Sequence, residues 1–198
     1  MSSNIALGLK HAGDTHENRP AVALGRTTLQ SYAQLAGRAA RLAAGLRDKL
    51  GLQPSDRVVI ASKNRPEYVE AMYGVWWGGF TAVPANAKLH GAEFRYILDN
   101  SGAQVCLVGP ELFETIVEHR PDSLEHLVVL GSDAYAVLFD PDPAPLAEVE
   151  AEEAARRAAE QARQARIRAD EEAAAAQNEQ HQALEGGDGR CRHRLALQ

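Results

Sequence analysis

The sequence predicts an α/β fold, in which a doubly wound and mostly parallel sheet carries helices on its faces and a long helical tail follows. Three observations lead to this prediction. Short apolar runs rich in β-branched residues alternate with segments of helical periodicity. Successive core strands recur about every 25 residues, which is a spacing typical of strand–helix–strand units. The segments between them are long enough for the crossovers that parallel strands need.

The first predicted elements precede the main sheet. Two short strands are expected on either side of the turn Gly25-Arg26. A long helix should follow, because apolar residues recur there at helical spacing, Ser31 is a suitable N-cap and Gly51 a suitable end. The expected ranges are strands at 21–24 and 27–29 and a helix at 32–50.

Four core strands and three helices then alternate. Pro66 suits the first turn of a helix, and Pro84 is expected to end a strand because it cannot donate to a ladder. Trp76 and Trp77 lie at helical spacing with other apolar residues, which favours a place in the core over a cofactor face. The expected ranges are strands at 57–61, 80–83, 104–108 and 126–130, with helices at 66–78, 90–100 and 111–119 between them.

The composition changes near residue 140. Every Phe, Tyr and Trp lies between Tyr32 and Phe139, so we expect residues 1–140 to form the α/β domain. A proline-rich linker at 141–148, an Ala/Glu/Arg-rich helix at 149–178 and a disordered tail at 179–198 are predicted after it. Alanines in that helix alternate by four and three, as in a coiled coil, but alanine buries little area. A solvated single helix is therefore favoured over weak self-association.

Charge and composition exclude several classes of protein. The formal net charge is −6 and no basic stripe is present, which argues against nucleic-acid binding. The two cysteines are far apart; Cys106 stands in an apolar run and is expected to be a buried, inert thiol. No signal peptide and no apolar stretch of membrane-spanning length is evident. A cytoplasmic protein without a membrane span is expected.

Motifs that would mark an active site are absent. The sequence has no G-x-G-x-x-G, no G-x-x-x-x-G-K-[ST] and no G-x-S-x-G. His11 and His16 could bind a metal with neighbouring carboxylates, but a solvated loop is favoured for this polar segment. His90 is expected to be a cap or loop residue, and His119 and His126 to lie at the surface. No catalytic, cofactor-binding or metal-ligating residue is assigned.

Three segments, taken in order, carry a resemblance. They are "RTTLQSYAQLAGRAARLAAGL" at 26–46, the stretch at 51–89 that contains "SDRVVIASKN" and "FTAVPAN", and "FRYILDNSGAQVCLV" at 94–108. Together they resemble the N-terminal region of the AMP-dependent, adenylate-forming acyl-CoA synthetase and ligase family, over about Ile5 to Asp140. The asparagine at position 86 resembles the fatty-acyl and aryl-acyl ligases more than the peptide-synthetase adenylation domains, in which an Asp is more usual at this place.

The resemblance implies a reaction but not the parts that perform it. Members of this family join a carboxylic acid to ATP, with Mg²⁺, and then transfer the acyl group to coenzyme A. Their Ser/Thr/Gly-rich phosphate loop, which ends in Lys, would be expected soon after "LAEVEA", yet no Lys follows Lys88. The family's adenine-binding motif and its C-terminal lid are also missing. Asn64 and the Pro84-Ala85-Asn86 turn are expected to be packing and turn residues.

We therefore expect an N-terminal fragment of an AMP-forming acyl-CoA ligase that is inactive alone and binds no cofactor by itself. Two alternatives stay open. The chain could be a non-catalytic interaction module with a self-associating tail, or it could be one half of a split ligase.

Overall fold

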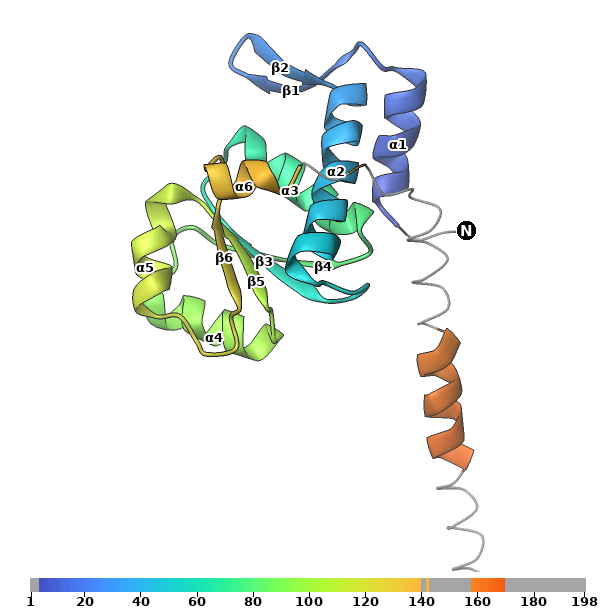
Figure 1. Ribbon diagram of the computed structural model, residues 1–198, viewed down its shortest axis with the longest axis vertical. Helices are drawn as coiled ribbons and strands as arrows, with labels where there is room; N and C mark the ends of the chain where they lie inside the picture. The colour runs from blue at the N-terminus through green and yellow to red at the C-terminus, as the bar shows by residue number, and fades with distance from the viewer. Residues whose placement is uncertain (1–3, 140–141, 143–157, 170–198) are drawn as a thin grey trace, which may run out of the picture. The chain divides into compact units, whose positions relative to one another are not determined.

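The computed structural model describes residues 4–139, 142 and 158–169 (Figure 1). Contacts divide the chain into two compact units, Met1–Glu153 and Ala154–Gln198. In the second unit the described part is a helix at 158–169, whose residues are all exposed. This helix falls within the predicted range 149–178. The rest of that range, the predicted linker apart from Asp142, and the predicted tail at 179–198 lie outside the described residues.

The first unit is built on a parallel sheet of four strands in the order β4-β3-β5-β6. This arrangement confirms the predicted α/β class. Each strand is short and apolar, and β3 and β5 are buried along almost their whole length. The strands are β3 (Arg57–Ala61), β4 (Thr81–Ala85), β5 (Val105–Val108) and β6 (His126–Val129).

Helices cover both faces of this sheet (Figure 1). Side chains alternate between the faces along each strand, so Val58 and Ile60 of β3 join one apolar cluster and Val59 and Ala61 join the other. The first face packs against α2 (Tyr32–Leu50), α3 (Pro66–Trp77) and α6 (Asp133–Val137). The second packs against α4 (Gly91–Ser101), the 3₁₀ turn η1 (Pro110–Leu112) and α5 (Phe113–Glu118).

The predicted N-cap of α2 is confirmed. Ser31 Oγ accepts a hydrogen bond from the Gln34 backbone N–H, and Gln34 Oε1 accepts one from the Ser31 backbone N–H at 2.8 Å. This reciprocal pair satisfies two backbone donors that an uncapped helix would leave open. At the other end Gly51 adopts a left-handed conformation with φ of 73° and ends the helix, also as predicted.

The N-terminal segment differs from the prediction. Residues Ala6–Thr15 form helix α1, so the loop predicted around His11 is wrong; His16 is the C-cap of this helix. The reason is packing: Ala6 and Leu9 are buried one turn apart in a third apolar cluster with α2 and Trp77. After α1, the two predicted strands, β1 (Pro20–Leu24) and β2 (Thr27–Ser31), pair as an antiparallel hairpin.

Two further differences concern the strands and their ends. The prediction that Pro84 ends its strand is wrong, because β4 continues to Ala85 with Pro84 in register with Ile60. Among the described residues β4 pairs only with β3, and an edge strand tolerates a residue without an N–H. Helix α6 was not predicted; it has five residues and begins where Ser132 Oγ accepts from the Tyr135 N–H.

Candidate functional site

The carboxyl ends of the parallel strands lie at one edge of the sheet, which is where doubly wound proteins bind ligands. The chain leaves β3 for α3 on one face and leaves β5 for α5 on the other. The topological switch point therefore lies between β3 and β5. In many folds of this class, such a crevice receives a nucleotide.

In this protein the crevice is bridged by the chain itself. The Glu111 carboxylate, which follows β5, accepts a hydrogen bond of 2.7 Å from the Lys63 backbone N–H, which follows β3. Gly109 permits this closeness, because a Cβ there would lie 2.6 Å from both Ser62 Oγ and Glu111 Oε1. The Gly109 N–H also donates to the Ala61 carbonyl at 2.8 Å. Glu111 already occupies the Lys63 backbone N–H, so this donor is not free for a nucleotide phosphate.

An open pocket of about 570 Å³ lies beside the bridged crevice, at the ends of β3 and β4. It is formed by the loop after β3, the loop after β4 and the first turn of α3. The residues that line it are Ser62, Lys63, Asn64, Tyr68, Ala85, Asn86, Ala87 and Lys88. We call it the lysine pocket. Asn64 and Asn86, which the sequence indicated as packing and turn residues, both lie on its wall.

The lysine pocket has the chemistry of an anion site. Lys63 and Lys88 are exposed, and neither ammonium group forms an ion pair with any other described residue. Asn86 Oδ1 accepts from the Lys88 backbone N–H at 3.0 Å, which fixes the loop that carries this lysine. Ammonium and amide N–H groups are the donors that phosphate and carboxylate oxygens prefer. The donor set thus fits a phosphate group.

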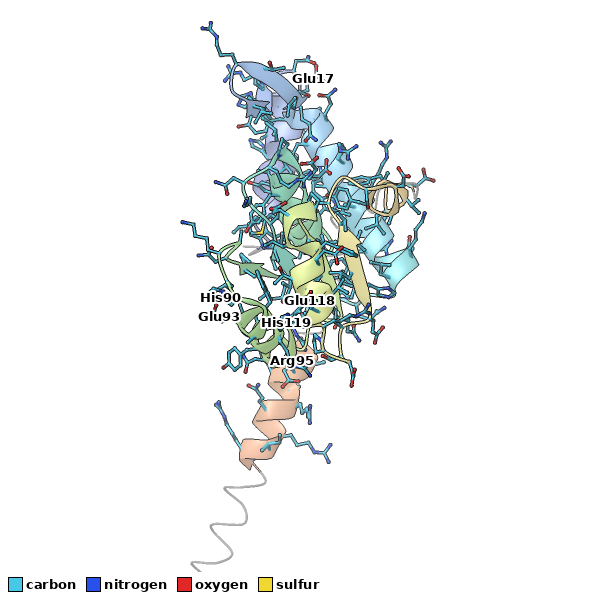
Figure 2. All side chains as sticks on the ribbon, turned by 90° about the vertical axis from the view of Figure 1, so that its left-hand side faces the viewer. Glu17, His90, Glu93, Arg95, Glu118 and His119 are labelled. Carbon is cyan, nitrogen blue, oxygen red and sulfur yellow. The ribbon has the colours of Figure 1, made fainter. Side chains whose placement is uncertain are left out.

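The histidines are placed by local structure. His90 is the N-cap of α4, as predicted, and Figure 2 shows it beside Glu93. The His119 ring packs over Gly91, where a Cβ would come within 2.2 Å, and Glu93 Oε2 accepts the His90 backbone N–H. Within 4–139, 142 and 158–169 no cluster of three or more His, Cys, Asp or Glu residues could hold a metal ion. The absence of assigned metal ligands stays a prediction.

Cys106 is fully buried in β5, as predicted. Burial raises the pKa of its thiol to about 12, so the nucleophilic thiolate is scarcely formed at neutral pH. The side chain contributes packing in the second apolar cluster and no chemistry to the lysine pocket.

One charged group was missed by the sequence analysis. Glu70 of α3 is only 1% exposed, although it falls in a helix predicted from its apolar stripe. Its carboxylate pairs with Arg38 of α2 and accepts hydrogen bonds of 3.0 Å from Tyr135 Oη and from Gln30 Nε2. The Arg38 guanidinium also lies 4.1 Å from the Phe139 ring centroid. We call these residues the Glu70 network.

The Glu70 network joins parts of the chain that no local pattern connects. Gln30 belongs to β2, Arg38 to α2 and Tyr135 to α6, up to 65 residues from Glu70. The hydrogen bond to Glu70 raises the pKa of Arg38. Burial, and then the Glu70 carboxylate, raise the pKa of Tyr135 well above its ordinary value. The Glu70 carboxylate, the Arg38 guanidinium and the Tyr135 hydroxyl are paired with one another, which indicates a structural tie, whereas Gln30 Oε1 is buried without a hydrogen-bond partner among the described residues.

Comparison with known proteins places this fold in a family. The sequence profile described as "AMP-binding enzyme" matches residues 9–183. The chain belongs to the AMP-binding enzyme family and corresponds to the N-terminal region of its acyl-CoA ligases, as the resemblance implied. The match extends past Asp140 into the segment that the sequence assigned to a separate helix.

Several of the similar proteins are acyl-CoA ligases or synthetases. A medium/long-chain-fatty-acid–CoA/3-oxocholest-4-en-26-oate–CoA ligase of Mycobacterium tuberculosis is 42% identical over 137 residues, which cover 67% of this chain and 25% of that protein. A feruloyl-CoA synthase of Amycolatopsis sp is 42% identical over 96 residues, covering 48% and 19%. The chain therefore spans about a quarter or less of the length of these relatives.

Solved structures give the same assignment. The N-terminal domain of FACL13 from Mycobacterium tuberculosis superposes with a TM-score of 0.65 at 27% identity, covering 72% of this chain and 37% of that one. A benzoate CoA ligase from Burkholderia xenovorans gives a TM-score of 0.62 at 25% identity, covering 71% and 29%. Within the described part of this chain, no helix is both long and apolar enough to traverse a bilayer.

Proposed function

We propose that this chain provides the N-terminal region of an AMP-forming ligase that activates a fatty or aryl carboxylic acid and passes it to coenzyme A. The observation that carries the proposal is the family match over residues 9–183, together with relatives that act on fatty, feruloyl and benzoate substrates. The fold supports it, since the solved N-terminal ligase domain superposes on the same sheet and helices.

Within that reaction the lysine pocket holds a phosphate group of ATP or coenzyme A. Two ammonium groups on neighbouring loops can stabilise the negative charge of phosphate, and the asparagine side chains add neutral donors. When bound, ATP supplies the adenylate that makes a carboxylate reactive. The residues of the lysine pocket bind and orient the phosphate group. Among the described residues, no group of this pocket is assigned to proton transfer.

Titration of the purified chain with inorganic pyrophosphate and, separately, with coenzyme A tests the pocket. Both ligands should shift the backbone amide resonances of Lys63, Asn64 and Lys88. Lys63→Ala and Lys88→Ala should each weaken binding by about tenfold, or ~1.4 kcal/mol. Lys10→Ala is the matched control, because Lys10 lies on α1 in an exposed pair with Asp14. Equal losses in all three variants would refute a specific pocket.

We further propose that the 198-residue chain alone does not form acyl-adenylate. Its sequence contains no Ser/Thr/Gly-rich loop that ends in Lys, and Lys88 is its last lysine. Without that loop the transferring phosphates lack the preorganised donors that stabilise the charge of the transition state. ATP–pyrophosphate exchange with decanoate, benzoate or ferulate should stay at background. Exchange above background with any of these acids contradicts the proposal.

Weak self-association is proposed for the second unit. In the helix at 158–169, Ala158, Ala162, Ala165 and Ala169 share one face, and every residue is exposed. An alanine face buries little apolar area, so we expect a dissociation constant near or above the millimolar range, about −4 kcal/mol. Sedimentation equilibrium over a range of concentrations measures it. A tight dimer at micromolar concentration would contradict this expectation.

A further inference from the structure

The loop after β3 carries three residues of the lysine pocket, Ser62, Lys63 and Asn64, and its ends are held in different ways. Ser62 is 6% exposed, and its Oγ donates to the Lys63 carbonyl at 2.9 Å. At the far end Arg65 pairs with Glu67 at 2.9 Å in the first turn of α3. Lys63 and Asn64, between these anchors, are exposed. The exposed part of the loop that lines the pocket is therefore Lys63 and Asn64.

One side chain from another strand reaches that segment. Glu111 Oε1 accepts the Lys63 backbone N–H at 2.7 Å across the switch point. Among the described hydrogen bonds this is the one that ties Lys63 or Asn64 to a residue outside their own loop. The same contact lowers the pKa of the Glu111 carboxyl, so the charged acceptor is present at neutral pH. The tie spans 48 residues of sequence and links the ends of β3 and β5.

We infer that Glu111 is a positioning residue for the lysine pocket: it holds the Ser62–Lys63 peptide through the Lys63 N–H, so that the side chains of Lys63 and Asn64 face the bound phosphate. This inference rests on the proposed role of the pocket. Glu111 does not line the pocket, so it acts through Lys63 rather than on the ligand. Ordering two residues before binding removes part of the entropy that phosphate binding would otherwise have to overcome.

An electrostatic role and a hydrogen-bonding role of Glu111 predict opposite effects of its substitution on phosphate binding. A carboxylate near the pocket repels phosphate, so a purely electrostatic role means that any neutral substitute strengthens binding. A positioning role means that the neutral substitute must still accept a hydrogen bond. Glu111→Gln and Glu111→Ala both remove the charge, and only glutamine keeps an acceptor of the same reach. The difference in pyrophosphate affinity between the two variants therefore measures the contribution of the hydrogen bond.

The experiment compares pyrophosphate affinity of the full chain and its variants by NMR titration. We expect Glu111→Gln to bind as well as the original chain or up to about twofold more tightly, and Glu111→Ala to bind about tenfold more weakly. Glu114→Ala is the matched control, since Glu114 is exposed on α5 and accepts no hydrogen bond among the described residues. If the alanine and glutamine variants change in the same direction by the same factor, the inference is overturned.

Hydrogen exchange at the Lys63 amide separates this inference from the role of the pocket. Exchange should be faster in Glu111→Ala than in Glu111→Gln, by about tenfold, whether or not pyrophosphate binds. If pyrophosphate fails to shift the pocket amides but this difference is seen, the proposed phosphate role fails and the positioning of the loop stands. Equal exchange rates in the two variants overturn the positioning of Lys63 by Glu111.

Discussion

Glu70 shows how one residue organises the first unit. Among the described residues it is the charged side chain that is fully buried, and burying an unpaired carboxylate would be prohibitive. Arg38, Tyr135 and Gln30 compensate by pairing with it from three other elements. Such a network favours one arrangement of β2, α2, α3 and α6, because the partners of the buried Glu70 carboxylate come from all of these elements.

Replacing Glu70 by alanine should destabilise the first unit by about 3 kcal/mol. The variant loses the Arg38 pair and leaves the buried Tyr135 hydroxyl without its acceptor. Urea unfolding followed by Trp fluorescence measures the change. Glu114→Ala, which removes an exposed charge, is expected to alter stability by less than about 0.5 kcal/mol. A Glu70→Ala variant as stable as this control would show that the network contributes nothing.

Tyr135 gives the same network a pH dependence. Its pKa in the folded state is raised above the unfolded value of about 10. Above pH 10 the unfolded chain therefore loses a proton that the folded chain keeps, and the free energy of unfolding falls as pH rises. The stabilisation is fully present below that value. Between pH 9 and 11 the decline should be shallower in Tyr135→Phe than in the original chain; parallel declines would contradict this assignment.

At the scale of elements, α6 is clamped onto α2 by its backbone. The Lys49 Nζ donates to the Val137 carbonyl at 2.7 Å, and the Leu138 carbonyl lies directly over Gly45. Phe139 then stacks beneath Arg38. The chain leaving α6 thus runs back along α2, from Lys49 past Gly45 to Arg38. A five-residue helix gains from these contacts the stability that its length cannot provide.

Gly45→Ala should release this clamp. The added Cβ would lie 1.9 Å from the Leu138 backbone oxygen, which cannot move without displacing α6. We expect a loss of about 2–3 kcal/mol and faster amide exchange in α6. Gly37→Ala on the same helix meets nothing within 4 Å and should instead stabilise by about 0.5–1 kcal/mol. Similar effects of the two substitutions would argue against a steric clamp.

The elements also show what sequence can predict. Periodicity and caps were sufficient for the β1–β2 hairpin, α2 and the four parallel strands, because these patterns are local. Helix α1 was missed because its buried face is narrow, and α6 because its contacts come from distant residues. The lysine pocket and the Glu111 tie join loops that meet only after the sheet forms, so spacing could not indicate them.

At the scale of the whole chain, large apolar side chains are left exposed in the first unit. Leu24 and Leu29 of the β1–β2 hairpin are 66% and 43% exposed, and Tyr96 of α4 is 68% exposed. The matched regions make up only 25% and 19% of these relatives, and further chain in such proteins can cover surface of this kind. Exposed apolar surface of this extent favours binding of hydrophobic dyes.

We expect the isolated chain to enhance the fluorescence of anilinonaphthalene sulfonate under native conditions. The double variant Leu24→Ser/Leu29→Ser should lower that signal by about half while changing unfolding by less than about 0.5 kcal/mol, because both side chains are already solvated. Lys88→Ala serves as the control for attraction of the anionic dye to the lysine pocket. Absence of dye binding by the original chain would contradict the expectation.

The reactivity of Cys106 can report how often the core opens. A thiol fully enclosed in β5, with its pKa raised to about 12, can meet an alkylating reagent only when the sheet opens. With Cys191→Ser removing the second thiol, labelling at neutral pH should follow opening alone and accelerate in Glu70→Ala by the factor that its stability loss predicts. Acceleration by that factor identifies a single cooperative opening. An alkylation rate that Glu70→Ala leaves unchanged would mean that β5 opens independently of the Glu70 network.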